Sequence, residues 1–184
     1  KFKKEGFNPI VHAGASSVAF VFPEAYFDMV RIGIALYGLW PSKEVEKSSK
    51  VKLKPILQWK TIIGEIKNVS KDSRVGYDFT EKFQKNSTIA ICPIGYWHGY
   101  PRNLSSIGNV LVCGKRARIL GRVSMDMIAI DISNISGVKV GSEVTLLGAD
   151  GKKTISAEEV ADWAGTSSYE IVTRINPLIK KFYT

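Results

Sequence analysis

The stretch NVLVCGKRARIL, residues 109–120, decides the fold of most of this chain. Its two arms flank Cys113-Gly114-Lys115, and a short tip with glycine between two strand-like runs is typical of a β-hairpin. A second hairpin is predicted in SEVTLLGADGKKTI, residues 142–155, which turns at Asp150-Gly151. Because each hairpin joins neighbouring strands that run in opposite directions, this part of the chain is predicted to be antiparallel β-structure.

Further strand patterns surround these hairpins. Apolar and polar residues alternate in LKPILQWKTIIGEIKNV, residues 53–69, and in STIAICPIGY, residues 87–96. GRVSMDMIAIDIS, residues 121–133, is expected to form another long strand. Several short strands joined by tight turns favour a compact antiparallel β-barrel or sandwich. We therefore assign residues 50–184 to a mainly β domain.

A helix is predicted near the end of this domain. Ser156 stands where an N-cap would, and Glu159 follows three residues later, as in a capping box. The helix is expected to continue until Gly165. A second short helical stretch is expected around residues 167–172.

Before residue 50 the pattern changes to that of an α/β protein. NPIVHAG, residues 8–14, is short and apolar and is expected to be a strand, and VRIGIALYG, residues 30–38, is expected to be a fully buried strand that ends in glycine. A helix is expected between them. Residues 1–49 are too few for a domain, so we predict the last βαβ part of a (β/α)8 barrel, a fold of about 250 residues. The polar segment PSKEVEKSSK, residues 41–50, is predicted to be a linker.

Composition restricts the class of protein. A chain of 184 residues that is 45% hydrophobic and 23% charged is ordinary globular material. Two cysteines, Cys92 and Cys113, favour reduced thiols and a cytoplasmic protein. The sequence contains no apolar run of membrane-spanning length, so no membrane partner is expected. With His12 and His98 as the only histidines, no metal site is predicted.

The net charge of +9 raises the question of an acidic partner such as nucleic acid. The lysines lie in short groups spread along the chain, and the aromatic residues do not form an RNA-stacking signature. We therefore favour a solvated basic surface and expect no nucleic-acid partner.

Four sequence segments contain candidate catalytic or binding residues: VRIGIALYG; RVGYDFT, residues 74–80; PIGYWHGYPR, residues 93–102; and GRVSMDM, residues 121–127. Each places a Tyr, an Arg or backbone amides beside glycine, where the main chain can approach a ligand closely. In order and spacing, they resemble the C-terminal half of alanine racemase, a pyridoxal-phosphate enzyme. The resemblance extends over nearly the whole chain and implies the end of a barrel followed by a β domain.

The resemblance also implies a site for pyridoxal 5'-phosphate. Arg31 would face the pyridine nitrogen, which must then accept a hydrogen bond because arginine keeps its proton near neutral pH. His12 would support Arg31 from behind. The remaining residues implied at the phosphate are the hydroxyl of Ser16, the amides of Gly33 and Ile34, and Tyr169 in GTSSYEIVTRI.

Tyr77 is the residue that the resemblance implies as general acid and base, acting in the partner subunit's active site. Racemisation removes the α-proton from one face of the substrate and returns a proton to the other face. The reaction therefore needs two bases on opposite sides of the cofactor, and a lysine and a tyrosine serve these faces in the family.

Four further residues are implied around the substrate. The backbone amide of Met125 would bind the substrate carboxylate, and Tyr96 would line the site. Arg102 and Arg122 would border its entrance. The resemblance implies a homodimer with shared active sites that interconverts L- and D-alanine for bacterial peptidoglycan synthesis.

The Schiff-base lysine of the family lies on the first barrel strand, in a phrase that does not occur in this chain. The chain begins at Lys1 without a methionine, which suggests a processed or truncated protein, and the missing chemistry is expected to lie upstream. By itself, the chain is expected neither to hold the cofactor tightly nor to racemise alanine.

Three alternatives remain open from the sequence. A basic β-barrel could bind RNA, although the tyrosine and glycine phrases would then be unexplained. A racemase-derived domain could have lost catalysis, which Ala15, His98 and the altered arginine spacing after Arg174 allow. The fold could also act on serine or another small amino acid, against which Tyr169 argues because it narrows the pocket.

Overall fold

The computed structural model describes residues 2–183, with side chains from residue 4 on. Contacts within the chain define two compact units, Lys1–Ile56 and Leu57–Thr184, and each is described separately. The division proposed from the sequence, between residues 49 and 50, falls inside the first unit. In the described part of the chain, no helix has the length and apolar character needed to cross a bilayer.

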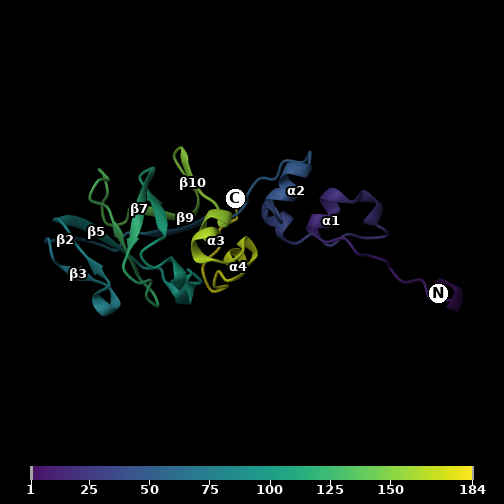
Figure 1. Cartoon of the computed structure of the whole chain (residues 1–184), viewed down its shortest axis with the longest axis horizontal. Helices are drawn as coiled ribbons and strands as arrows, with labels where there is room; N and C mark the ends of the chain where they lie inside the picture. Colours follow the sequence, from purple (N-terminus) through teal and green to yellow (C-terminus); the bar gives the residue numbers. More distant parts are fainter. Residues whose placement is uncertain (1, 184) are drawn as a thin grey trace. The chain divides into compact units, whose positions relative to one another are not determined.

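The second unit is built on one antiparallel sheet with the strand order β1-β9-β6-β7-β8-β5-β2, and β10 pairs with β9 (Figure 1). A separate pair, β3 and β4, forms a two-stranded sheet. The strands are β1 (Trp59–Ile62), β2 (Glu65–Val69), β3 (Arg74–Val75), β4 (Glu81–Lys82), β5 (Ser87–Cys92), β6 (Asn109–Val112), β7 (Lys115–Leu120), β8 (Ile128–Asp131), β9 (Glu143–Asp150) and β10 (Lys153–Ile155).

The large sheet curls until its two ends meet. The end strands, β1 and β2, are consecutive in the chain and are separated only by Ile63 and Gly64. At this bend the Ile63 N–H donates to the Ser142 carbonyl (2.9 Å) and the Gly64 N–H to the Ile91 carbonyl (2.8 Å). One continuous stretch therefore pairs with β9 on one side and β5 on the other. The predicted mainly antiparallel β fold is confirmed.

Buried and partly exposed side chains alternate along the strands, and the buried ones form the core of this unit. In β8, Ile128 and Ile130 are buried, whereas Ala129 and Asp131 are half-buried. Phe83, Ile89 and Leu120 form a buried cluster at the base of the β3–β4 pair. Burying each large side chain contributes about 1.5–3 kcal/mol, so the interior strands stabilise the unit strongly.

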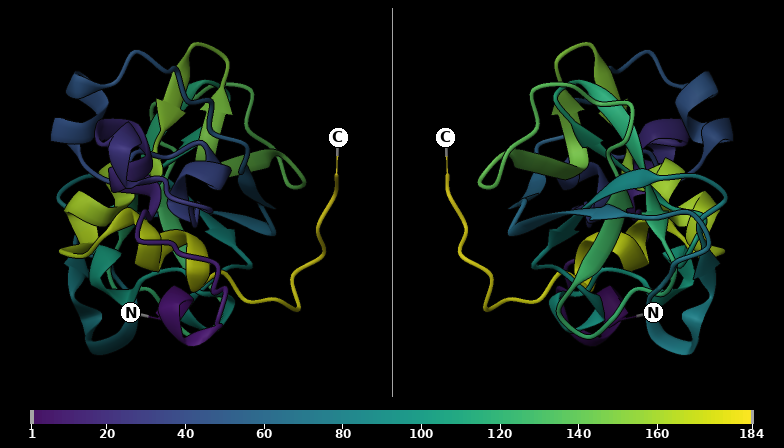
Figure 2. Two further views of the ribbon diagram at one scale, coloured as in Figure 1. Left: turned by 90° about the vertical axis from the view of Figure 1, so that its right-hand side faces the viewer. Right: turned by 90° about the vertical axis from the view of Figure 1, so that its left-hand side faces the viewer.

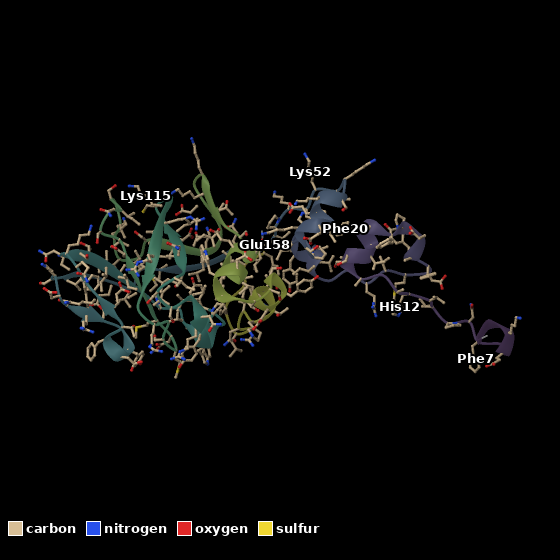
Figure 3. All side chains as sticks on the ribbon, viewed as in Figure 1. Phe7, His12, Phe20, Lys52, Lys115 and Glu158 are labelled. Carbon is tan, nitrogen blue, oxygen red and sulfur yellow. The ribbon has the colours of Figure 1, made fainter. Side chains whose placement is uncertain are left out.

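Both predicted hairpins are present. The β6–β7 turn places Cys113 (φ 49°) and Gly114 (φ 70°) in the left-handed region, as a two-residue turn of the primed type requires. The β9–β10 turn begins at Asp150, whose carboxylate accepts a hydrogen bond from the Gly114 N–H (2.8 Å). This bond joins the tips of the two hairpins, and Lys115 beside them projects outward (Figure 3).

The prediction of one long strand over residues 121–133 is wrong for its first half, because β8 covers only Ile128–Asp131. The Ser124 hydroxyl accepts from the Met127 N–H (3.1 Å) and donates to the Met127 carbonyl (2.6 Å). These local bonds fold the chain into a turn, which competes with strand pairing.

The two C-terminal helices are α3 (Ala157–Ala164) and α4 (Ser168–Thr173), which pack against each other. The Ser156 hydroxyl accepts from the Glu159 N–H (3.1 Å), and Gly165 ends α3 with φ 67°, so the predicted cap and stop are confirmed. After α4, residues 180–183 leave the β unit as an extended segment (Figure 2).

The first unit contains short helices only: η1 (Phe2–Glu5), α1 (Ser16–Val21), η2 (Pro23–Ala25), η3 (Ile34–Tyr37) and α2 (Lys43–Ser48). The buried strand expected over residues 30–38 is wrong, and so is a strand over residues 8–14. A single parallel bridge joins Ala15 and Arg31. Beyond it Gly33 (φ −115°, ψ −93°) turns the chain into η3. A parallel strand needs hydrogen-bonding neighbours along its length, and within this unit the 30–38 segment has one bridge.

The linker expected over residues 41–50 contains α2. The Ser42 hydroxyl caps this helix by accepting from the Val45 N–H (3.3 Å), and Glu44 lies in its first turn. The cap and the acidic first turn favour a helix even where no apolar periodicity marks one.

Candidate functional site

Tyr77 lies on a tight exposed loop between β3 and β4. Gly76 (φ 83°) leads into η4 (Tyr77–Phe79), and Asp78 and Phe79 also have positive φ (59° and 51°). The Arg74 guanidinium donates to the Phe79 carbonyl (3.2 Å) across the base of the loop. Because the loop turns so sharply, the Tyr77 side chain is 69% exposed and its phenol is available to another molecule.

Arg122 lies beside this loop. Its Nε is 3.0 Å from the Asp78 carboxylate, an ion pair whose N–H direction does not form a hydrogen bond. A Cβ placed on Gly76 would lie 3.4 Å from the Arg122 nitrogen, so the two backbones are close. The structure therefore brings together Tyr77 and Arg122, two residues predicted at the site.

A second pair of predicted residues, Tyr96 and Met125, meets on adjacent turns. The Tyr96 N–H, at the start of η5 (Tyr96–His98), donates to the Ser124 carbonyl (3.0 Å), and the Trp97 N–H donates to the Met125 carbonyl (2.9 Å). Both Tyr96 and Met125 are exposed. Among residues 2–183 the Met125 N–H has no acceptor, so this amide is available for a ligand.

The η5 turn is held by interactions that the sequence did not predict. His98 Nδ1 accepts from the Gly95 N–H (3.1 Å), and the imidazole packs edge-on against Trp97. Asn176 donates its N–H to the His98 carbonyl and its side-chain amide to the Trp97 carbonyl, each at 3.0 Å. His98 is thus part of the turn's framework, and no group of three metal-ligating side chains occurs among the described residues.

An open cavity of about 720 Å³ adjoins this turn. Tyr96 and Arg102, at the start of η6 (Arg102–Leu104), line one side. Glu170 and Arg174 line the other side, and their Nε–Oε1 distance is 2.9 Å. The predicted entrance residue Arg102 therefore borders an open cavity whose lining carries both positive and negative charges.

Two buried groups, Tyr100 in the cavity lining and Cys92 on β5, are held neutral. The Tyr100 hydroxyl has no hydrogen-bond partner in the described structure, and burial raises its pKa. Burial also raises the pKa of the Cys92 thiol to about 12. Neither group ionises near neutral pH, so neither is a candidate nucleophile or base.

In the first unit the structure brings four predicted residues together. The buried Ser16 hydroxyl accepts from the Gly33 N–H (3.0 Å), which leaves the hydroxyl proton free to donate. The Arg31 N–H donates to the Gly14 carbonyl (2.8 Å), and Ile34 begins η3, where the first N–H groups have no partner within the helix. No atom lies within 4 Å of a Cβ placed on Gly33, so this corner is open to a ligand.

His12 and Tyr169 are the two remaining residues that were predicted at the cofactor. His12 lies on the extended segment before α1, is exposed and projects from the ribbon (Figure 3). Tyr169 belongs to α4 in the other unit and is exposed, and its carbonyl accepts from the Thr173 hydroxyl (2.7 Å). Their roles remain predictions.

Comparisons with known proteins identify the class to which this geometry belongs. The family model "Alanine racemase, C-terminal domain" matches residues 56–183, and "Alanine racemase, N-terminal domain" matches residues 1–41. The chain thus carries parts of two consecutive domains of one enzyme class, the amino-acid racemases.

The chain belongs to the alanine racemase family. It is 45% identical over 186 residues to the alanine racemase of Leptospira interrogans, covering 97% of this chain and 48% of that protein. The relative from Halothermothrix orenii is 44% identical, with 95% and 46% covered. The chain therefore spans about half the length of these relatives.

Solved structures agree with this assignment. Alanine racemase from Bacillus anthracis with bound L-Ala-P matches with a TM-score of 0.89 at 41% identity, covering 95% of this chain and 45% of that one. Alanine racemase from Streptomyces coelicolor matches with a TM-score of 0.85 at 35% identity, with 95% and 46% covered.

Proposed function

We propose that this chain forms the C-terminal part of an alanine racemase that interconverts L- and D-alanine with pyridoxal 5'-phosphate. The observation that carries the proposal is the exposed Tyr77 phenol on its strained loop beside Arg122. The family membership and the L-Ala-P bound by the Bacillus anthracis relative support alanine as substrate.

We assign residues 1–49 to the end of the enzyme's barrel domain and residues 50–184 to its β domain. Residues of the first unit fit the phosphate end of the cofactor. The Ser16 hydroxyl and the amides of Gly33 and Ile34 would hold the phosphate, since they gather at an open corner. Arg31 would face the ring nitrogen with His12 behind it, and Tyr169 would reach the phosphate. When bound, pyridoxal phosphate stabilises the negative charge that develops on the substrate's α-carbon.

Tyr77 moves the proton on one face of the substrate. Its phenol gives a proton to the α-carbon in one direction of the reaction and accepts it in the other. The base for the opposite face is a lysine outside this chain. Met125 and Tyr96 would orient the substrate, because the Met125 N–H is available to the carboxylate. Arg102 and Arg122 at the entrance attract that carboxylate electrostatically.

The working enzyme in this proposal is a cytoplasmic, bacterial homodimer whose D-alanine enters peptidoglycan. Tyr77 and Met125 project from the β unit and would serve the partner subunit's cofactor, which explains why both are exposed. No nucleic acid or membrane takes part.

The test is Tyr77→Phe in the full-length protein that contains this chain. We expect racemisation to fall about 10²–10⁴-fold, because the phenol proton is lost while the ring remains. Cofactor binding should be unchanged, since Tyr77 is not among the residues that we assign to the phosphate or to the ring nitrogen. Tyr183→Phe, at a 92% exposed position, is the matched control. Equal rates for Tyr77→Phe and wild type in both directions would rule out Tyr77 as the acid and base. The chain of 184 residues, tested alone, should be inactive.

A further inference from the structure

We infer that Glu81 and Arg118 form a clamp that positions Tyr77 for proton transfer, an inference that rests on the proposed racemase function. Glu81 begins β4, directly after the Tyr77 loop, and Arg118 lies on β7 of the large sheet. No sequence motif marks this pair, because the two residues are 37 positions apart.

The clamp consists of three hydrogen bonds to one carboxylate. Arg118 Nη2 donates to Glu81 Oε1 (2.5 Å), and Nη1 donates to Oε2 (3.2 Å). The Gly121 N–H also donates to Oε2 (3.3 Å). A two-pronged arginine–carboxylate contact is strong and directional, so it fixes the start of β4 relative to β7. Glu81 raises the pKa of Arg118 through the same hydrogen bond, consistent with a firm pair.

The turn that follows β7 holds the other side of the loop. A Cβ on Gly121 would lie 3.2 Å from the Val75 carbonyl oxygen and 3.5 Å from the Thr80 hydroxyl, so the Gly121 backbone sits between the two arms of the hairpin. The next residue, Arg122, pairs with Asp78 inside the loop. The Tyr77 loop is therefore held before, within and after the tyrosine by one short turn.

Tyr77 depends on this support because its own side chain makes no hydrogen bond to any described residue. Its position therefore depends on the backbone of residues 76–80. A displacement of about 1 Å at a reacting group can cost about 10²-fold in rate. By contrast, Arg118 is 45% exposed, and a pair on the surface adds little to stability. The side chain of Glu81 is 13% exposed, which keeps the carboxylate in place.

The test uses Glu81→Gln, which keeps the side-chain volume, and Arg118→Lys, which keeps the charge, in the full-length holoenzyme. Glu143→Gln is the control for loss of an ion pair, since Glu143 forms a single, more exposed contact with Lys60 (2.7 Å) away from the loop. We expect kcat to fall about tenfold in both clamp variants with KM within about twofold, and no change in the control. Clamp variants that behave like Glu143→Gln would overturn the inference.

Two further measurements distinguish misplacement of the Tyr77 phenol from a general loss of active-site structure. In a Tyr77→Phe background, Glu81→Gln should add almost nothing, because the clamp acts through the phenol. The isotope effect with α-deuterated alanine should rise for one enantiomer and fall for the other, since only one face uses Tyr77. Fully additive losses, or isotope effects that change equally for both enantiomers, contradict positioning.

Failure of the proposed racemase function can be distinguished from failure of the clamp inference. If the wild-type holoenzyme does not racemise alanine at all, the function is wrong, but the clamp is still measurable by hydrogen exchange of the amides of residues 76–80. Glu81→Gln should speed their exchange about tenfold relative to Glu143→Gln. Unchanged exchange would remove the clamp, whichever reaction the protein catalyses.

Discussion

At the scale of single residues, space rather than backbone conformation requires glycine at position 95. Gly95 has φ −160° and ψ −164°, an extended conformation open to any residue. A Cβ there would lie 2.5 Å from the Met125 carbonyl oxygen and 2.6 Å from the Asp126 nitrogen. The missing side chain thus lets the η5 turn and the 124–126 turn hydrogen-bond directly, which places Tyr96 beside Met125.

Gly95→Ala should therefore destabilise the β unit by about 1–3 kcal/mol, because one of the two backbones must move. Urea unfolding followed by circular dichroism measures this change. Gly64→Ala is the control, since its Cβ would meet the Ile91 carbonyl oxygen at an ordinary 3.6 Å. A Gly95→Ala protein as stable as Gly64→Ala would show that the two turns do not need this approach.

Because of Cys92, we expect the stability of the β unit to fall at alkaline pH. Burial raises the pKa of its thiol from 9.0 to about 12, because the thiolate would lose its hydration. The contribution of the neutral thiol is complete below pH 9 and is lost as the pH rises toward 12. The free energy of unfolding should fall in that window by at most about 1.4 kcal/mol per pH unit from this group.

The measurement is urea unfolding at several pH values, compared with Cys92→Ala. The variant should show a shallower decline between pH 9 and 10.5, about the accessible part of this window. The exposed Cys113 should react with iodoacetamide in the folded protein, and Cys92 only after unfolding. Equal pH slopes in both proteins would remove Cys92 as the cause.

At the scale of elements, local side-chain bonds decided where strands and helices begin and end. The hairpin tips at Cys113-Gly114 and Asp150-Gly151 were predictable because turn conformation depends on a few adjacent residues. The same locality explains the error at residues 121–133, where the Ser124 hydroxyl closes a turn on Met127. A serine in an alternating pattern does not reveal whether it caps a turn or faces solvent.

The N-cap of α3 offers a test at this scale. Ser156→Ala should destabilise the β unit by about 1 kcal/mol, because the Glu159 N–H loses its acceptor. Ser156→Asp should restore most of the loss, since a carboxylate also accepts this bond and favours a helix N-terminus. Thermal unfolding of the three proteins compares them. No difference between Ser156→Ala and Ser156→Asp would mean that the cap does not limit stability.

At the scale of the whole molecule, the two units differ in how much core they possess. Among the described residues, the largest fully buried side chains all belong to Leu57–Thr184, whereas Ile34 and Leu39 are the buried large apolar residues of the first unit's described part. That unit exposes many apolar side chains, including Phe7, Ile10, Phe22, Phe27, Met29 and Leu36. Such surface is costly in water and is normally covered by other protein.

We expect residues 57–184, expressed alone, to fold cooperatively, because their barrel is closed by hydrogen bonds within the unit. Residues 1–56, expressed alone, should lack a cooperative transition, since so little of their apolar surface is buried. Circular dichroism and urea unfolding of both pieces measure this. An unfolded 57–184 piece, or a cooperatively folded 1–56 piece, would contradict the division.

The sequence by itself determined the mainly β class, both hairpins, the Ser156 cap and the family, because each depends on local patterns or on ordered motifs. It placed Tyr77, Tyr96, Arg102, Arg122 and Met125 on three separate segments, residues 74–80, 93–102 and 121–127. Only the tertiary structure decided which of them meet. Tyr96 lies beside Met125 because Gly95 permits backbone contact, and Tyr77 lies beside Arg122 because the backbone of Gly121 comes close to Val75 and Thr80 on either side of the loop. Contacts between residues far apart in the chain depend on how the barrel closes, and no local pattern encodes that geometry.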